Sequence, residues 1–208
     1  MFTGLIQEIG TIKKIKKASH HIELTCAASR ELLQGYKVGD SMAVNGVCLT
    51  ATTVTASDFT VDIMPETFHK STFSDLRVHA KVNLERAMSA NARFEGHIVS
   101  GHVDVTTRLI KKVRKENAVI LTFYYPPQIQ GEIVPQGSVA INGTSLTVSN
   151  VAPGTFSVSL IPFSMHHTNL GQLKQGEFVN IETDILGKYI KAMIGPDKKH
   201  ALHKYMGE

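Results

Sequence analysis

The sequence has no tryptophan and only two cysteines, Cys26 and Cys48, among its 208 residues. Two cysteines are too few for a disulfide framework, and these two lack the close spacing of a zinc site. The chain also lacks a basic leader followed by an apolar run, and no stretch approaches the roughly 18 apolar residues of a membrane span. We therefore expect a cytoplasmic protein with reduced thiols and no membrane-spanning segment.

The charge is mildly positive, since 22 Lys and Arg against 18 Asp and Glu give a formal net charge of +4. The basic residues are spread out except in two short runs, 13–17 and 111–115. Proteins that bind single-stranded nucleic acid usually line a basic groove with aromatic side chains. Aromatic residues make up only 7% of the chain and few lie near these runs. No nucleic-acid partner is therefore expected.

The chain consists of two copies of one unit. The stretch "VNGVCLT" at 44–50 returns 97 residues later as "INGTSLT" at 141–147. The same offset aligns further positions without a gap, among them Gly4 with Gly101, Pro65 with Pro162, His69 with His166, and "VNLE" with "VNIE". One register that holds over this length indicates a tandem repeat.

The local patterns within each copy are those of short strands. Alternating residues lead into Asn45-Gly46 and Asn142-Gly143, and Asn-Gly is the strongest short hairpin signal because both residues accept a positive φ. Many short strands separated by turns are typical of an antiparallel sandwich or a small closed barrel. We therefore predict an all-β fold with two tandem β-barrels, one in residues 1–97 and one in residues 98–184.

The last segment, 185–208, follows a different pattern. Asp184 can cap a helix that ends at Gly195-Pro196, and its apolar residues recur at helical spacing: Ile185, Leu186, Tyr189, Ile190, Met193 and Ile194. Such a stripe packs either on its own barrel or against the same helix of other subunits. Periodicity alone leaves both arrangements open.

The two copies differ where chemistry is expected. The offset pairs Leu5 with His102 and Cys48 with Ser145, and it also pairs Asp62 with Ser159 and Glu66 with Phe163. By itself, Cys48 reads as a small buried hydrophobe, and Ser41 reads as a strand-entry residue. The position of Cys48 just after the Asn-Gly turn favours a ligand contact instead.

The stretch "GHIVSGHVD" at 96–104 carries two histidines, His97 and His102, and Asp104. An imidazole titrates near neutrality and a carboxylate can orient it, so the segment is a candidate for a general acid or base. The two histidines could also bind a metal, but no third ligand is apparent, and a spacing of five points them to opposite faces of a strand. Either histidine could instead be an ordinary core or surface residue.

Six ordered motifs resemble those of the riboflavin synthase family, the lumazine-binding-repeat enzymes: "MFTGLI", "VNGVCLT", "MPET", "GHIVSGHVD", "INGTSLTV" and "ILGKYI". The resemblance covers essentially the whole chain before Gly195. It implies two homologous six-stranded Greek-key barrels, each holding one pteridine, and a C-terminal helix and tail, 185–208, that assembles a homotrimer. Lumazine synthase is a candidate partner.

The family resemblance also implies a transferase reaction. Two molecules of 6,7-dimethyl-8-ribityllumazine dismutate by four-carbon transfer to riboflavin and 5-amino-6-(ribitylamino)uracil, with no metal, flavin or nucleotide cofactor. In the family, the site lies between the N-terminal barrel of one subunit and the C-terminal barrel of its neighbour. A non-catalytic lumazine- or flavin-binding protein of the same fold is the alternative, although such proteins tend to lose the segment at 96–104.

The resemblance implies the ligand contacts as well. In the first repeat they fall on Gly4, Leu5 and Ile6, on Cys48, Leu49 and Thr50, and on Asp62, Ile63, Met64, Pro65, Glu66 and Thr67. In the second repeat they fall on Gly101, His102 and Val103, on Gln136, on Ser145, Leu146 and Thr147, and on Ser159, Leu160, Ile161, Pro162, Phe163 and Ser164.

By the same resemblance, turnover is expected to depend on Phe2, Ser41, Cys48 and His102. The hypothesis is that His102 assists proton transfer, while Ser41 or Cys48 supplies or positions the nucleophile that activates the partner ring. Two positions depart from the family pattern. Gln136 stands where the family often has lysine, and Phe163 stands where the first repeat would predict a carboxylate.

Overall fold

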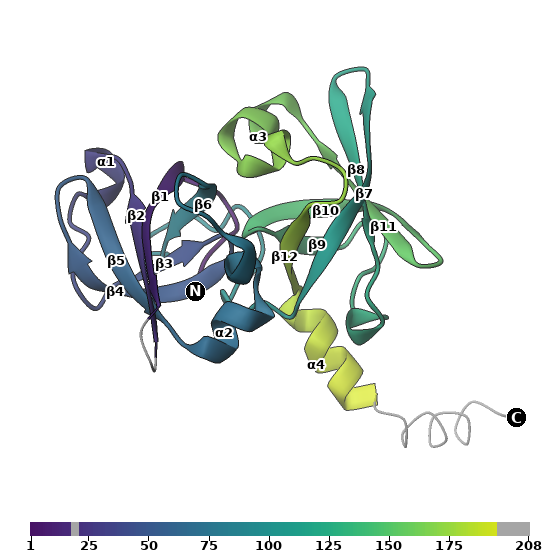
Figure 1. Cartoon of the computed structure of the whole chain (residues 1–208). Helices are drawn as coiled ribbons and strands as arrows, with labels where there is room; N and C mark the ends of the chain where they lie inside the picture. The colour runs from purple at the N-terminus through teal and green to yellow at the C-terminus, as the bar shows by residue number, and fades with distance from the viewer. Residues whose placement is uncertain (18–20, 195–208) are drawn as a thin grey trace, which may run out of the picture.

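Short alternating strands close into two barrels in the computed structural model, which describes residues 1–17 and 21–194 (Figure 1). The first barrel has the order β1-β2-β5-β4-β3-β6. Its strands are β1 (Glu8–Lys17), β2 (Ile22–Ala27), β3 (Ser41–Val44), β4 (Val47–Val54), β5 (Asp58–Ile63) and β6 (Lys81–Arg86). All neighbouring strands are antiparallel, and β6 lies beside β3 after three hairpin-connected strands, which is Greek-key connectivity.

The second barrel repeats this order strand for strand, as β10-β11-β8-β7-β12-β9. Its strands are β7 (Val105–Lys115), β8 (Ala118–Tyr124), β9 (Ser138–Ile141), β10 (Thr144–Ala152), β11 (Thr155–Leu160) and β12 (Phe178–Thr183). The all-β prediction of two six-stranded barrels is therefore confirmed.

Short helices cover the barrels. In the first barrel they are α1 (Arg30–Leu33), α2 (Pro65–Lys70) and η1 (Thr72–Asp75), and in the second η2 (Pro127–Ile129), α3 (Pro162–His167) and η3 (Asn169–Gln172). α2 and α3 each begin at a proline, whose fixed φ and missing N–H suit the first position of a helix.

Each barrel buries its own apolar core. Phe59 and Phe73 are almost fully buried in the first, and Phe123 stacks on Phe156 in the second. The alternating burial along β2 and β8 shows that inward-facing residues follow the period of two expected for a strand.

The barrels meet across equivalent positions of the two repeats. Phe2 and Val99 form an antiparallel bridge, and both pack with Ala43 and Ala140 in a separate small core. Both Asn-Gly turns have positive φ at each residue, as the hairpin prediction requires, and they pack against each other at this junction.

Buried asparagine amides join the two turns. The Asn83 Nδ2 donates to the carbonyl oxygen of Asn142 at 2.9 Å, and the Asn180 Nδ2 donates to that of Asn45 at 2.9 Å. Asn83 and Asn180 are the asparagines of the repeated "VNLE" and "VNIE" motifs. These asparagines are therefore present in both repeats as hydrogen-bond donors across the junction between the barrels.

The final helix, α4 (Ile185–Ile194), leaves the end of β12 and extends beyond the barrels (Figure 1). Leu186, Tyr189, Ile190 and Met193 are exposed on it. The predicted end of the helix at Gly195-Pro196 and the tail that follows lie outside the described residues. Within the described part of the chain, no helix is long and apolar enough to span a membrane.

Candidate functional site

The segment before each barrel contacts the other barrel: the segment around Gly4 contacts the second barrel, and the segment around Gly101 contacts the first. The Cys48 backbone N–H donates to the Gly101 carbonyl at 2.9 Å, and the Ser145 N–H donates to the Gly4 carbonyl at 2.8 Å. The structure therefore groups Gly101 and its neighbours with the first barrel, and Gly4 with the second. This arrangement differs from the grouping by repeat, which placed Gly4 with Cys48.

Glycine is required at both crossing points. Gly4 has a φ of +78° and Gly101 a φ of +83°, a region that L side chains rarely adopt. A Cβ atom on Gly4 would lie 2.6 Å from the Ser145 Cβ, and one on Gly101 would lie 2.5 Å from the Cys48 Cβ. Any side chain at these positions would push the segment off its barrel.

A glutamate holds each crossing segment in place. The Glu85 carboxylate accepts hydrogen bonds from the Thr3 N–H at 2.7 Å, the Thr3 hydroxyl at 2.8 Å and the Gly4 N–H at 3.0 Å. Burial raises the pKa of Glu85, and these hydrogen bonds oppose the rise.

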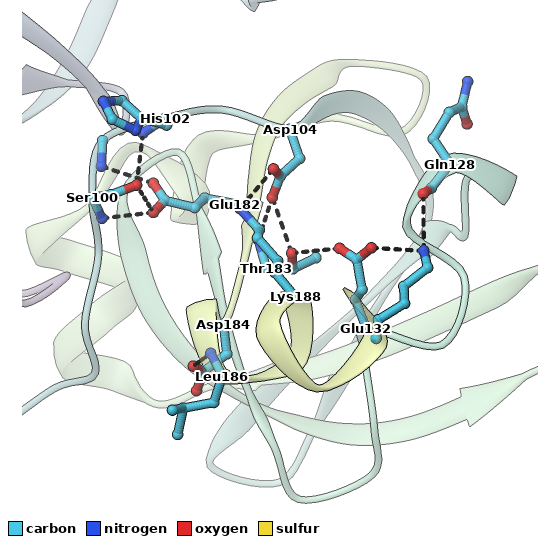
Figure 2. A network of polar contacts seen from close by, with 12 residues as sticks. Ser100, His102, Asp104, Gln128, Glu132, Glu182, Thr183, Asp184, Leu186 and Lys188 are labelled. Atoms are coloured by element: carbon cyan, nitrogen blue, oxygen red, sulfur yellow. Dashed lines mark hydrogen bonds and ion pairs between the residues drawn. The ribbon is translucent and has the colours of Figure 1, made fainter. Parts of the chain in front are cut away.

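The second repeat builds the same clamp, with Glu182 in place of Glu85. The Glu182 carboxylate accepts from the Ser100 N–H and hydroxyl, each at 2.6 Å, and from the Gly101 N–H at 2.9 Å (Figure 2). The sequence reading did not predict these clamps. They could have been suspected from the glutamate that ends both "VNLE" and "VNIE", since it occupies the same position in each repeat.

A pocket of about 300 Å³ opens where the segment after Gly101 meets the first barrel. Predicted site residues that line it are Cys48, Glu66, Thr67, Gly101, His102 and Val103. Val47, Lys70 and Ser71 complete the lining, and the sequence reading did not name them. The structure thus brings Cys48 and His102, which are far apart in the sequence, to one site.

The polar groups of this pocket include an ion pair on α2. The Lys70 Nζ lies 2.6 Å from the Glu66 Oε1, and this contact lowers the pKa of Glu66. The spacing of four residues places both side chains on the same face of the helix. The same spacing in the sequence could have predicted that Lys70 lies beside Glu66.

The two cysteines are free thiols in different environments. Cys26 is fully buried in the first barrel, and burial raises its pKa to about 12, so it is an inert core residue. Cys48 is half-buried on the pocket. Cys48 is therefore the thiol available for chemistry.

Other predicted site residues of the first repeat lie away from the pocket. Phe2 is fully buried at the barrel junction, and Leu49 and Ile63 point into the barrel core. Ser41 and Thr50 face each other across β3 and β4. The remainder, Asp62, Met64 and Pro65, are exposed around the start of α2.

The equivalent positions of the second barrel have different side chains. Phe163 stacks on His167 with ring centroids 4.0 Å apart, where the first barrel has the Glu66–Lys70 pair. Phe163 is 65% exposed, and Leu5, which is also exposed, stands where the first barrel has His102. The second site therefore presents an aromatic and apolar surface.

The remaining predicted residues of the second repeat divide between surface and core. Leu146 and Leu160 are buried in the barrel. Ser164 is half-buried, as is Ile6 of the first repeat, and Thr147, Ser159, Ile161 and Pro162 are exposed. Gln136 is exposed in a turn at a φ of +65°, and its N–H donates to the Val148 carbonyl.

His97 belongs to the second barrel and lies apart from His102. Its Nδ1 is 2.7 Å from the Ser145 Oγ, and its side chain is nearly enclosed, with 7% of the residue exposed. Burial lowers the pKa of His97, and the charge of Asp184 opposes this. His97 and His102 contact different parts of the molecule, and within residues 1–17 and 21–194 no group of three or more His, Cys, Asp or Glu could hold a metal.

About nine-tenths of the chain resembles known lumazine-binding domains and riboflavin synthases. Residues 3–87 and 100–184 each match the lumazine binding domain. Riboflavin synthase of Bacillus subtilis is 46% identical over 190 residues, which are 91% of this chain and 88% of that protein. Riboflavin synthase of Actinobacillus pleuropneumoniae is 43% identical over 194 residues, 93% of this chain and 90% of that protein.

Solved structures agree with these relatives. The crystal structure of LumP complexed with riboflavin has a TM-score of 0.82 and 26% identity, over 88% of this chain and 99% of LumP. That of LumP complexed with 6,7-dimethyl-8-(1'-D-ribityl)lumazine has a TM-score of 0.79 and 25% identity over the same shares. With two matched domains and these full-length relatives, the chain belongs to the riboflavin synthase family.

Proposed function

We propose that this chain converts two molecules of 6,7-dimethyl-8-ribityllumazine into riboflavin and 5-amino-6-(ribitylamino)uracil. The observation that carries the proposal is the pocket in which Cys48 of the first barrel meets His102 of the second repeat. Relatives named riboflavin synthase match over about nine-tenths of the chain, which supports the same activity.

The chemistry needs a base and close placement of two identical rings. The lumazine ring is electron-poor, so one of its methyl groups is acidic, and His102 takes up the proton that this group loses. The resulting carbanion forms a carbon–carbon bond to the second ring, which addition of the Cys48 thiolate has activated, and the thiolate is expelled again as the new ring forms. Of the two nucleophiles suggested by the family resemblance, Cys48 lines the pocket and Ser41 does not. Holding both rings face to face makes this step effectively unimolecular.

The transfer is balanced between the two substrate molecules. Two carbon–carbon bonds form between the four-carbon unit and the acceptor, which becomes riboflavin, and the two carbon–nitrogen bonds that hold this unit in the donor break, which leaves the diaminouracil product. The proton held by His102 is available to the leaving amine, and no external oxidant or reductant is consumed. The predicted contacts of both repeats serve as the two ligand sites.

We further propose a homotrimer in which the first barrel of one subunit faces the second barrel of its neighbour. Support comes from the exposed apolar face of α4 and from an apolar groove of about 680 Å³ beside it, lined by Val134, Leu186 and Ile190. We place the protein in the cytoplasm because both cysteines are free thiols. Lumazine synthase is a further proposed partner.

The second candidate is a lumazine- or flavin-binding protein without activity, favoured by the similarity to LumP with bound riboflavin. Incubating the purified protein with the lumazine and following riboflavin fluorescence separates the two. We expect riboflavin and the diaminouracil in equal amounts. Tight binding of the lumazine without product would overturn the enzymatic proposal.

His102→Gln tests the proton-transfer role. We expect ligand binding within about threefold of the parent and turnover reduced by about 100-fold, the scale of general acid–base catalysis. His69→Gln is the matched control, because His69 is exposed on α2 and does not line the pocket. Unchanged turnover in the His102 variant would refute the role.

A further inference from the structure

The segment that carries His102 is fastened at both ends to the last residues of β12. On one side, Ser100 donates to the Glu182 carboxylate, and the His102 N–H donates to the Ser100 Oγ at 3.3 Å. On the other side, the Asp104 Oδ2 accepts from the Thr183 N–H at 2.8 Å. Along the chain His102 lies between these two attachments, and in Figure 2 it lies beside Ser100.

The second attachment continues into the C-terminal helix. The Lys188 Nζ of α4 lies 2.6 Å from the Asp104 Oδ1, and the two side chains are 25% and 23% exposed. One Asp104 oxygen therefore contacts β12 and the other contacts α4. The carboxylate, which the sequence reading offered as a partner that could orient the His102 imidazole, instead connects the His102 segment to the helix.

A second lysine of α4 forms a similar pair that does not include the His102 segment. The Lys191 Nζ lies 2.7 Å from the Glu132 Oε1, in the loop before β9. The Thr183 hydroxyl is within hydrogen-bonding distance of both carboxylates, at 3.0 Å from Asp104 and 2.8 Å from Glu132. Each lysine thus balances one of two neighbouring negative charges, and only Lys188 contacts the segment of the pocket.

We propose that Asp104 and Lys188 are positioning residues for His102, so that docking of α4 on the second barrel sets the place of the imidazole in the first-barrel pocket. This inference rests on the proposed function of that pocket. Without Lys188, the Asp104 carboxylate faces the Glu132 carboxylate across a shared hydroxyl, and like-charge repulsion favours release of Asp104. Its release removes the side-chain attachments of the His102 segment to Thr183 and to α4, while the Asp104 N–H still donates to the Ile181 carbonyl at 2.9 Å.

Variants of the full-length protein test the coupling. We expect Asp104→Asn and Lys188→Met to lower kcat by about fivefold to tenfold with KM within about twofold, and Lys188→Arg to restore kcat to within about twofold. Lys191→Met is the matched control, because it removes the other ion pair of the same helix, and its kcat is expected to stay within about twofold of the parent.

A double-mutant cycle separates positioning from general destabilisation. If Asp104 acts through His102, Asp104→Asn adds no further loss of turnover in a His102→Gln background. Equal losses in the parent and in the His102→Gln background would overturn the inference. A Lys191→Met effect as large as that of Lys188→Met would also overturn it, since any loosening of α4 would then suffice.

A second readout does not depend on turnover. In protein labelled with 13C at the histidine Cε1, the His102 resonance is identified by its absence from His102→Gln. We expect it to shift or broaden in Asp104→Asn and Lys188→Met and to stay unchanged in Lys191→Met. An unchanged resonance in the first two variants refutes the positioning role. If His102→Gln is fully active but the resonance moves as expected, the proposed catalysis fails and the positioning stands.

Discussion

Gly46 and Gly143, which occupy the same position in the two repeats, face each other at the junction of the barrels. A Cβ atom on Gly46 would lie 2.6 Å from the Gly143 backbone nitrogen. The repeated Asn-Gly turns therefore form the contact between the barrels, while the residues just after them, Cys48 and Ser145, contact the segments that cross from the other repeat.

Gly46→Ala is expected to destabilise the protein by more than the backbone cost of a left-handed alanine, which is about 1 to 2 kcal/mol. Gly154→Ala is the matched control, because Gly154 also has a positive φ but no atom lies near its missing Cβ. Urea denaturation measures both. Equal losses of unfolding free energy would show that the close approach at the junction contributes nothing.

Asn83→Ala and Asn180→Ala are each expected to reduce the unfolding free energy by about 2 to 3 kcal/mol. Both substitutions leave buried groups of the opposite Asn-Gly turn without a hydrogen bond, and such groups cost about 1 to 3 kcal/mol each. Asn150, which is exposed on β10, provides the control. Losses in all three alanine variants no larger than about 0.5 kcal/mol would contradict the expectation.

Stability is expected to fall as the pH drops below about 6.5, the ordinary histidine pKa. The pKa of His97 is lowered in the folded state, so the unfolded chain binds a proton first, and the stability present above pH 6.5 is lost as the pH falls through the folded-state pKa. Glu85 acts in the opposite direction because its pKa is raised in the folded state. Its contribution to the unfolding free energy is present below pH 4.5 and is lost as the pH rises through the folded-state pKa.

Urea midpoints between pH 5 and 7 report on both groups, and a His97 variant isolates the contribution of the histidine. His97→Gln should flatten this part of the profile relative to His166→Gln, in which an exposed histidine is replaced. Parallel profiles for the parent and both variants would exclude His97 as the source.

Phe163→Ala is expected to weaken ligand binding at one of two sites by about threefold to tenfold, because it removes an exposed aromatic face stacked on His167. Glu66→Ala should weaken the other site. Phe178→Ala, which removes another exposed phenylalanine, is the control. A fluorescence titration with riboflavin resolves the two steps, and the same step moving in both variants would contradict two chemically distinct sites.

Removing the chain from Ile185 onward is expected to yield monomers in sedimentation. A milder variant, Tyr189→Ser with Met193→Ser, should weaken the assembly because it removes exposed apolar surface from α4. Lys191→Met is the control within the same helix. A stable trimer after the deletion would show that the helix is dispensable for assembly.

Much of the fold could be predicted because its signals are local. The Asn-Gly hairpins and the helical spacing after Asp184 each depend on a few neighbouring residues, and β3–β4, β9–β10 and α4 appear where expected. The constant 97-residue offset adds that the second half of the chain repeats the first. The glutamate clamps and the His97–Ser145 contact could not be predicted, since each joins residues at least 48 positions apart.

The sequence by itself determined the repeat and the barrel class, because period-two patterns and turn residues act over short distances. Most residues of the first pocket were predicted from the resemblance to the family and not from these patterns. Only the tertiary structure decided which segment serves which barrel. That choice depends on the chain path through the junction, where Gly101 passes over Cys48 and Gly4 passes over Ser145. Contact between segments so far apart follows from packing of the whole molecule and leaves no periodic signal in the chain.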